Sequence, residues 1–171
     1  TYQAKASDVL DLPKKMHIVK DIELGPMVRR GYRTLDKDFV AWVESGSAVV
    51  AKNALSKLSK LQQYTAGHIR YDDDDGRQVI ETVHVEKQNA VEEILDSIPQ
   101  DEPLVVFGVF IPDLDAIKQA TESAGRKYFE LSGAKNELAE WQDDTGGSVI
   151  GVQLQAGGVG ISLVRARYCC Y

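Results

Sequence analysis

The residues best suited to chemistry are three glycines near the C-terminus, within residues 153–163, which read Gln-Leu-Gln-Ala-Gly-Gly-Val-Gly-Ile-Ser-Leu. They directly follow an apolar run at 149–152, which is typical of a buried strand. Glycine lets the backbone adopt positive φ and come close to a ligand, and exposed backbone amides at such a turn suit phosphate. The same segment is also compatible with a tight turn that glycine merely permits. At this point both interpretations stay open.

The glycine spacing does not fit a dinucleotide-binding fingerprint, and the chain lacks the motifs of phosphoryl transfer. Leu163 stands where a dinucleotide-binding fingerprint after Gly158 and Gly160 would require a third glycine. The chain contains no Gly-x-x-x-x-Gly-Lys-Ser/Thr sequence and no Asp-Glu-x-His sequence. Phosphoryl transfer depends on a positioned lysine, Mg²⁺ and arginine. We therefore expect no catalytic residue in this chain and no ATP hydrolysis by the chain alone.

The remaining metal-binding residue types lack the spacing of a metal site. Four consecutive aspartates do not provide the alternating ligands of a calcium loop and are more typical of a solvated turn. The three histidines are far apart and lie at no metal-ligand spacing from a cysteine. The two cysteines are adjacent, which does not allow an ordinary structural disulfide and fits a reduced, intracellular setting. We therefore expect no metal ligand among these residues: Asp72 to Asp75, His17, His68, His84, Cys169 and Cys170.

A parallel sheet is the element predicted to position the glycine-rich segment. Short apolar runs alternate with amphipathic segments over the second half of the chain, which indicates strand–helix–strand units with right-handed crossovers. In such sheets ligands sit beyond the carboxyl ends of the strands. We predict strands at 104–107, 128–131, 149–152 and 167–171, and helices at 89–98, 113–124 and 135–142, with Asp113 as a helix cap after Pro112.

The first half of the chain has a different pattern. Residues 16–24 are predicted to be extended, and Gly25-Pro26 is expected to open a helix with one apolar stripe. A second helix is predicted at 48–64, and a β-hairpin at 69–85, with Gly76 supplying positive φ. We predict that residues 1–86 pack as an elaboration on a core formed by residues 87–171, in one folded unit. The tryptophans, Trp42 and Trp141, are expected in the core.

Composition limits the partners. The formal net charge is −6, with 26 acidic and 20 basic residues among 171, so any DNA contact must come from a local patch or from oriented amides. No apolar run approaches the roughly 20 residues of a membrane span, and no signal peptide is visible. We expect a protein without a membrane contact, cytoplasmic in a bacterium or a virus-infected cell and nuclear in a eukaryote. Basic residues in the first third could face DNA or form a solvated helix face.

The glycine-rich segment resembles a known motif. Residues 155–166, which read Gln-Ala-Gly-Gly-Val-Gly-Ile-Ser-Leu-Val-Arg-Ala, are similar to the fifth helicase motif of Snf-type ATPases. Other segments match the family in the same order along nearly the whole chain: 8–14 the lead into the second motor domain, 61–67 a helix end, 103–110 the fourth motif and 128–133 the turn that follows it. The resemblance implies the second RecA-like domain of such a motor, an α/β domain of three layers with a parallel central sheet, here ending before the sixth motif.

The resemblance also implies roles for individual residues. DNA-backbone contacts fall on Ser132, Gly133 and Lys135, where a helix N-terminus and one lysine could hold a phosphate, and on Gln155, Ala156 and Gly157 of the fifth motif. Gly158, Gly160 and Ser162 fall on the side that faces ATP. Three positions depart from the family pattern: Ser162 replaces an asparagine, Leu138 an arginine and Gly108 a serine.

The function implied is the C-terminal motor lobe of an ATP-dependent DNA helicase or translocase. ATP and Mg²⁺ would be held mainly by the N-terminal RecA-like domain of the same polypeptide, and DNA would be the other partner. A non-catalytic interaction domain that keeps the fold is the alternative from a different class. A nucleotide-binding regulator with residues 157–160 as its phosphate loop is a third interpretation. Fold alone does not separate them.

Overall fold

The computed structural model describes residues 15–44, 50–157 and 160–171, apart from the side chains of 38–44 and 50–55. The expected match to the family at 8–14 and the side chain of Trp42 therefore lie outside the described residues. Within them, the chain has a mixed α/β fold with a four-stranded parallel sheet.

The sheet consists of β3 (Leu104–Gly108), β4 (Tyr128–Leu131), β5 (Val149–Gln153) and β6 (Tyr168–Cys170). Their order is β4-β5-β3-β6, and all neighbours run parallel. The register pairs Val105 with both Ile150 and Cys169. The four predicted strands and their parallel pairing are confirmed, because short runs of β-branched and aromatic residues have few other ways to bury both faces.

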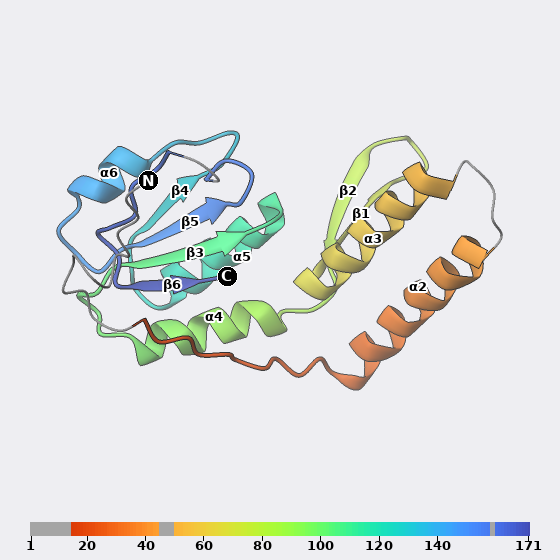
Figure 1. Cartoon of the computed structure of the whole chain (residues 1–171), viewed down its shortest axis with the longest axis horizontal. Coiled ribbons are helices and arrows are strands. Elements are labelled where there is room, and N and C mark those ends of the chain that lie inside the picture. The colour runs from red at the N-terminus through yellow and green to blue at the C-terminus, as the bar shows by residue number, and fades with distance from the viewer. Residues whose placement is uncertain (1–14, 45–49, 158–159) are drawn as a thin grey trace, which may run out of the picture.

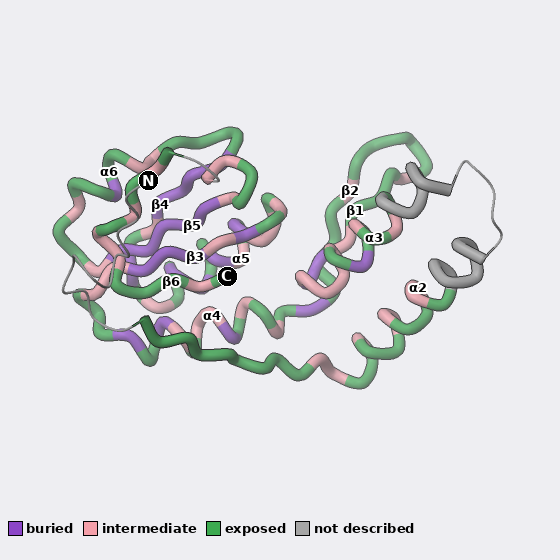
Figure 2. The backbone as a smooth tube through the Cα atoms, viewed as in Figure 1, coloured by how far each residue is buried: buried purple, intermediate pink, exposed green. Residues whose placement is uncertain are grey.

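Helices cover the two faces of the sheet. One face packs against α4 (Glu86–Ser97) and α5 (Ile111–Ser123), and the other against α6 (Leu138–Asp143) and the segment 161–166. Alternation along the strands assigns the side chains, so that Val106 faces α5 while Val105 faces α6. Trp141 of α6 is fully buried, as predicted. The core of the molecule therefore lies between residues 86 and 170 (Figure 2).

The first half of the chain forms a separate projection, which we call the arm. It consists of α2 (Pro26–Glu44), α3 (Val50–Ala66) and an antiparallel hairpin of β1 (His68–Asp72) and β2 (Gln78–Thr82). The predicted hairpin is confirmed, and Gly76 in its turn has φ +73°. Figures 1 and 2 show the arm beside the sheet, with few buried positions. Among the described elements, none of the arm packs extensively on a strand of the sheet.

Within the described residues, a small junction between the hairpin and α5 joins the arm to the sheet domain. The ring of His68 meets that of Phe110 edge-on with centroids 5.2 Å apart, and its Nδ1 lies 3.7 Å from Oδ1 of Asp113. His84 Nε2 lies 2.8 Å from the carbonyl of Tyr64, at the end of α3. Both histidines are buried and have partners, in line with a structural role.

Two predicted helix boundaries are corrected by the structure. Helix α5 begins at Ile111, so Asp113 is not the N-cap residue but the third residue of the first turn, where Oδ2 accepts hydrogen bonds from the amides of Val109 and Phe110, each at 2.9 Å. Helix α6 begins at Leu138, not at Lys135. Residues 15–25 are extended but join no sheet and are mostly exposed.

The described part of the chain contains no helix with the length and apolar character that a membrane crossing requires.

Candidate functional site

The carboxyl edge of the parallel sheet brings together the segments that the sequence singled out. The turn after β4 holds residues 132–137, and the loop after β5 holds the glycine-rich segment. Because β4 and β5 are neighbours in the sheet, these two loops emerge side by side. One hydrogen bond joins them directly, from the amide of Gly133 to Oε1 of Gln153 at 3.1 Å. In Figure 1 the arrowheads of β3, β4 and β5 point toward the side where the arm lies.

Ser132 organises the turn after β4. Its buried hydroxyl donates to Oε1 of Glu130 at 2.7 Å and accepts hydrogen bonds from the amides of Ala134 and Lys135, each at 3.2 Å. Its own amide donates to the carbonyl of Lys135 at 2.8 Å. The predicted phosphate-binding amides of this turn are therefore already bonded within the protein, and the residues lie in a turn ahead of α6 rather than at its N-terminus.

Lys135 is exposed and reaches back to the strand. Its Nζ lies 3.7 Å from Oε2 of Glu130, a carboxylate that is only 12% exposed. Lys135 therefore places a positive charge at the carboxyl edge of the sheet, but this charge is paired with Glu130. A phosphate approaching Lys135 would compete with Glu130 for the same ammonium group.

The first half of the glycine-rich loop is a compact turn. The amides of Ala156 and Gly157 both donate to the carbonyl of Gln153, each at 2.9 Å. A Cβ added at Gly157 would clash with Cγ1 of Val152 and lie 3.3 Å from Cδ1 of Ile161. Gly157 is therefore required for close packing of the loop on the sheet, which supports the structural interpretation for this glycine. Gln155 is exposed, and Ala156 is half-buried.

The second half of the loop is open. Gly160 is exposed and has φ +80°, and a Cβ added to it would meet no atom within 4 Å. A backbone in this conformation is unfavourable for other residues. Ser162 is exposed, and its carbonyl accepts a hydrogen bond from Nε2 of Gln142 at 2.7 Å. The predicted nucleotide-facing residue Gly158 lies outside the described residues.

These residues fit a nucleotide in part. Gly160 offers backbone that a ligand can approach without meeting a side chain, and Ser162 offers an exposed hydroxyl that can donate or accept. Among the residues that the structure describes, no group of three or more His, Cys, Asp or Glu is arranged to hold a metal ion.

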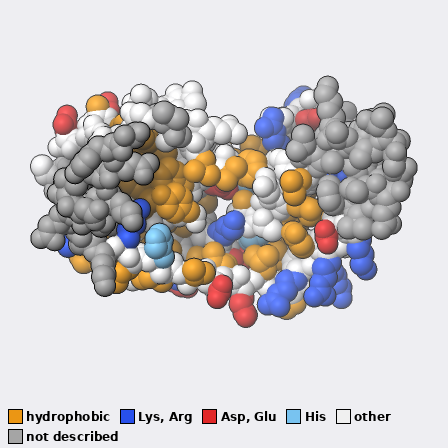
Figure 3. Space-filling model, in the orientation of Figure 1, with side chains coloured by type: hydrophobic (Ala, Val, Ile, Leu, Met, Phe, Trp, Pro, Cys, Tyr) orange, Lys and Arg blue, Asp and Glu red, His pale blue; other side chains and the backbone are white. Residues whose placement is uncertain are grey.

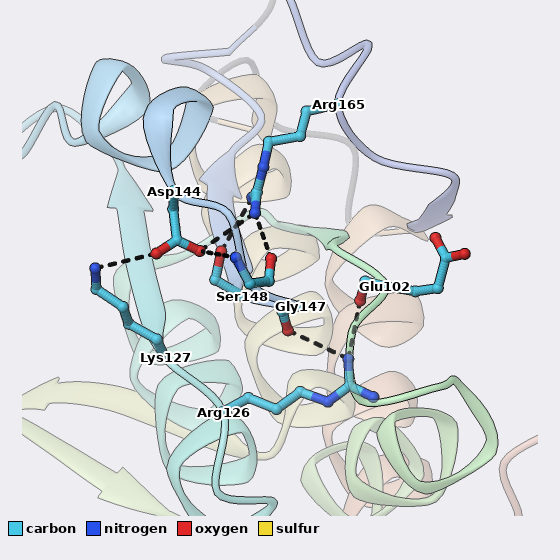
Figure 4. A network of polar contacts seen from close by, with 8 residues as sticks. Glu102, Arg126, Lys127, Asp144, Gly147, Ser148 and Arg165 are labelled. Carbon is cyan, nitrogen blue, oxygen red and sulfur yellow. Dashed lines mark hydrogen bonds and ion pairs between the residues drawn. The ribbon is translucent and has the colours of Figure 1, made fainter.

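The segment that follows the glycine-rich loop is anchored at the opposite edge of the sheet (Figure 4). Arg165 donates to Oγ of Ser148 at 3.0 Å and to Oδ2 of Asp144 at 3.2 Å, and its guanidinium lies 4.9 Å from the centre of the Trp141 ring. The hydrogen bond from Ser148 holds the pKa of Asp144 below its usual value; burial opposes this, and Lys127 reinforces it. This network fixes where the loop returns to the sheet.

A second arginine performs a structural role that the sequence did not indicate. Arg126 is buried, and its guanidinium donates to five backbone carbonyls around the C-terminal end of α4 and the turns before β3 and β5. Figure 4 shows two of these bonds, to Glu102 at 3.0 Å and to Gly147 at 3.3 Å. The other acceptors are Leu95, Ile98 and Pro99. No spacing pattern indicates such a residue, because its partners are backbone atoms.

Two of the departures from the family pattern can be placed. A Cβ added at Gly108 would lie 3.0 Å from Cβ of Asp113 and 3.2 Å from Cδ2 of Leu114. Glycine here allows the start of α5 to approach the end of β3 closely. Leu138 packs against the buried cluster around Trp141, so it serves the core and not the carboxyl edge.

The aspartate-rich loop and the cysteines behave as structural residues. In the hairpin turn, Oδ1 of Asp73 accepts hydrogen bonds from the amides of Asp75 at 3.0 Å and Arg77 at 2.8 Å. Such a bond from an aspartate to the backbone ahead of it is typical of a turn.

Cys169 is exposed, while Cys170 is half-buried and packs against the core. One of the two thus points inward and the other outward, as the strand alternation predicts.

Comparison with known proteins adds no family to this description. The chain matches no model of a protein family, and no curated protein matches it.

Proposed function

We propose that the chain is the second RecA-like motor lobe of a Snf-type, ATP-driven DNA helicase or translocase. The observation that carries the proposal is the meeting of two motif-like segments at one edge of a parallel sheet. The turn at 132–135 and the loop at 153–157 are about twenty residues apart in the sequence, and the hydrogen bond from Gly133 to Gln153 joins them. A motor lobe needs this arrangement, because both segments must reach one DNA strand.

In this proposal the carboxyl edge has two functional parts. Ser132, Gly133 and Lys135 lie beside Gln155, Ala156 and Gly157 on the part that contacts the DNA backbone. Gly158, Gly160 and Ser162 belong to the part that faces ATP. The ATP and its Mg²⁺ are held mainly by the N-terminal RecA-like domain of the same polypeptide, so this chain supplies one wall of the nucleotide cleft. Closure of the two lobes on ATP would move the protein along one strand.

The proposal is tested by replacing Lys135 with glutamine and measuring DNA binding by fluorescence anisotropy over a range of salt concentrations. Loss of one phosphate contact reduces the slope of log affinity against log salt by about 0.7 to 0.9. The matched control is Lys118→Gln, since Lys118 on α5 is also exposed and pairs with a glutamate, Glu122, at 3.9 Å. Equal slopes for the two variants would refute the phosphate contact at the carboxyl edge.

A non-catalytic interaction domain is the second candidate, and one observation favours it. The amides at 133–135 and 156–157 are bonded within the protein, and Lys135 is paired with Glu130. Amide donors that are already hydrogen-bonded within the protein contribute less to the binding of a phosphate. If the chain binds DNA no more tightly than its Lys135→Gln variant at low salt, this second candidate accounts better for the edge.

A further inference from the structure

A row of cations lies along one face of α2, in the arm. Arg30, Arg33 and Lys37 are separated by three and four residues, so they share one face of the helix, and all three are exposed. We call these three residues the basic face of α2. We propose that the basic face of α2 docks on the phosphate backbone of duplex DNA, at a place separate from the carboxyl edge of the sheet.

Within the described residues, the basic face differs from most other basic side chains in its ion pairing. Elsewhere, basic side chains commonly have acidic partners, as Lys127 has Asp144 at 3.3 Å and Arg167 has Glu102 at 2.8 Å. Among the residues that the structure describes, no carboxylate pairs with any member of the basic face. The neighbouring Arg29 is held by the protein, since its Nε donates to the carbonyl of Leu24 at 2.6 Å and its Nη2 lies 3.7 Å from Oε2 of Glu23. Positive charge is therefore available here in a chain whose net charge is −6.

The other side of α2 fixes the direction in which this face points. On the side of α2 that faces α3, a Cβ added at Gly31 would clash with the side chain of Tyr64, and Leu35 lines the groove there together with Arg30. Arg33 and Lys37 lie on the opposite side of the helix from Gly31 and Leu35, so these two cations cannot turn inward without exposing apolar surface. Figure 3 shows Lys and Arg side chains gathered over the α2 end of the arm. The helix thus presents its cations to solvent in a fixed orientation.

The spacing and charge of these three residues suit a chain of evenly spaced phosphates. The rise of about 1.5 Å per residue places Arg33 and Lys37 about 6 Å apart along the helix axis, close to the separation of successive phosphates on a strand. Arginine adds a planar fork that binds phosphate oxygens in pairs. The row from Arg30 to Lys37 carries no apolar side chain on this face, and the apolar groove lined by Met27, Leu35 and Tyr64 borders it at Arg30. Protein–protein interfaces depend on aromatic and other packed anchors, which the row itself lacks. DNA is therefore favoured over an acidic protein.

This inference rests on the proposed function, which brings DNA to the protein, and it adds a second contact to it. Among the described residues, the arm meets the rest of the molecule around His68 and His84, and Gly25, just before α2, donates to Oε1 of Glu86 at 3.4 Å. A contact on α2 would therefore hold duplex DNA away from the strand that the carboxyl edge contacts. Such a contact should not depend on DNA sequence, because phosphates carry no sequence information.

The test compares a triple variant, Arg30→Gln, Arg33→Gln and Lys37→Gln, with a control in which exposed lysines on other helices are changed: Lys60→Gln, Lys87→Gln and Lys118→Gln. Both variants lose three positive charges. Binding to a labelled duplex of mixed sequence is measured by anisotropy over a range of salt concentrations. We expect the slope of log affinity against log salt to fall in magnitude by about 2 to 3 in the first variant, and by less than about 1 in the control. Circular dichroism confirms that both variants fold.

Three other results would overturn the proposal. These are equal slopes for the two triple variants, no measurable binding of duplex by the unchanged chain at low salt, or retention of poly-glutamate rather than DNA by the basic face. Failure of the proposed function is recognised separately. If Lys135→Gln leaves the slope unchanged while the α2 variant lowers it, the α2 contact stands and the contact at the carboxyl edge fails. The reverse pattern refutes the α2 contact alone.

Discussion

Lys135 and Glu130 face each other at the end of β4, with Nζ 3.7 Å from Oε2. The residue that the family resemblance assigns to a phosphate is thus held beside an anion of its own strand. Glu130 is buried, and it also accepts the hydroxyl hydrogen of Ser132. The ion pair should weaken phosphate binding, because a phosphate must displace Glu130 from the ammonium group before Lys135 can bind it.

The pair gives a direct prediction for Glu130→Gln. The amide oxygen of glutamine can still accept from Ser132, but it no longer competes for Lys135. DNA affinity at low salt should rise by a factor of up to roughly five, the range expected from releasing an ion pair worth about 0.2 to 1 kcal/mol. Anisotropy with a short duplex measures it. The control is Glu137→Gln, which removes the same charge from a carboxylate that accepts from the backbone at 2.9 Å. An equal increase in DNA affinity in both variants would show that Glu130 does not compete with a phosphate for Lys135.

Gly157 should be more sensitive to substitution than a loop glycine that has free space around its Cα. Its Cβ would clash with Val152 and crowd Ile161, so Gly157→Ala should shift the loop and reduce the free energy of unfolding by about 1 to 3 kcal/mol. Urea denaturation measures the loss. Gly146→Ala is the matched control, because its Cβ would meet only Oδ2 of Asp144 at an ordinary 3.6 Å. Similar stability of the two variants would show that the loop is not packed as described.

The fold was largely predictable because its signals are local. The strand runs, the hairpin turn with Gly76 and the helix that opens at Pro26 all follow from backbone preferences and periodicity, and they are confirmed. The prediction of Asp113 as the N-cap residue is wrong, since an aspartate at the third position of a helix, whose carboxylate accepts from the amides before the helix, gives the same local pattern as one at its start.

The sequence predicted where the candidate site lies in the fold, but not which hydrogen bonds and ion pairs its residues form. The parallel order of β4 and β5 brings residues 132–135 and 153–157 together. The pairing of Lys135 with Glu130, and of Gly133 with Gln153, depends on side-chain directions that spacing does not specify. The position of the arm also escaped prediction, because its attachment depends on a few contacts around His68 and not on a repeated pattern.

The junction between arm and sheet should weaken as the pH falls. Burial lowers the pKa of His68 from 6.5; Asp113 opposes this shift, and Lys87 adds to it. The unfolded chain therefore binds a proton at a higher pH than the folded chain does, so stability falls as the pH decreases from about 7 through the lowered pKa. We expect His68→Gln to flatten the pH dependence of the free energy of unfolding over this window. A pH dependence of His68→Gln equal to that of the unchanged chain would count against the prediction.

Arg126 should be the most important single polar side chain for the stability of the sheet domain. Replacing it with alanine would remove a donor from five backbone carbonyls, of which those of Leu95 and Pro99 keep a backbone donor while those of Ile98, Glu102 and Gly147 lose the one that Arg126 supplies. Leaving a buried acceptor without a partner costs about 1 to 3 kcal/mol, so we expect a loss of about 3 kcal/mol or more. Arg167→Ala, which removes an exposed arginine paired with Glu102 at 2.8 Å, should cost at most about 1 kcal/mol. Urea denaturation of the two variants side by side decides the matter. A loss at Arg126 no larger than that at Arg167 would mean that water replaces the guanidinium at these carbonyls and that α4 is held by its apolar contacts alone.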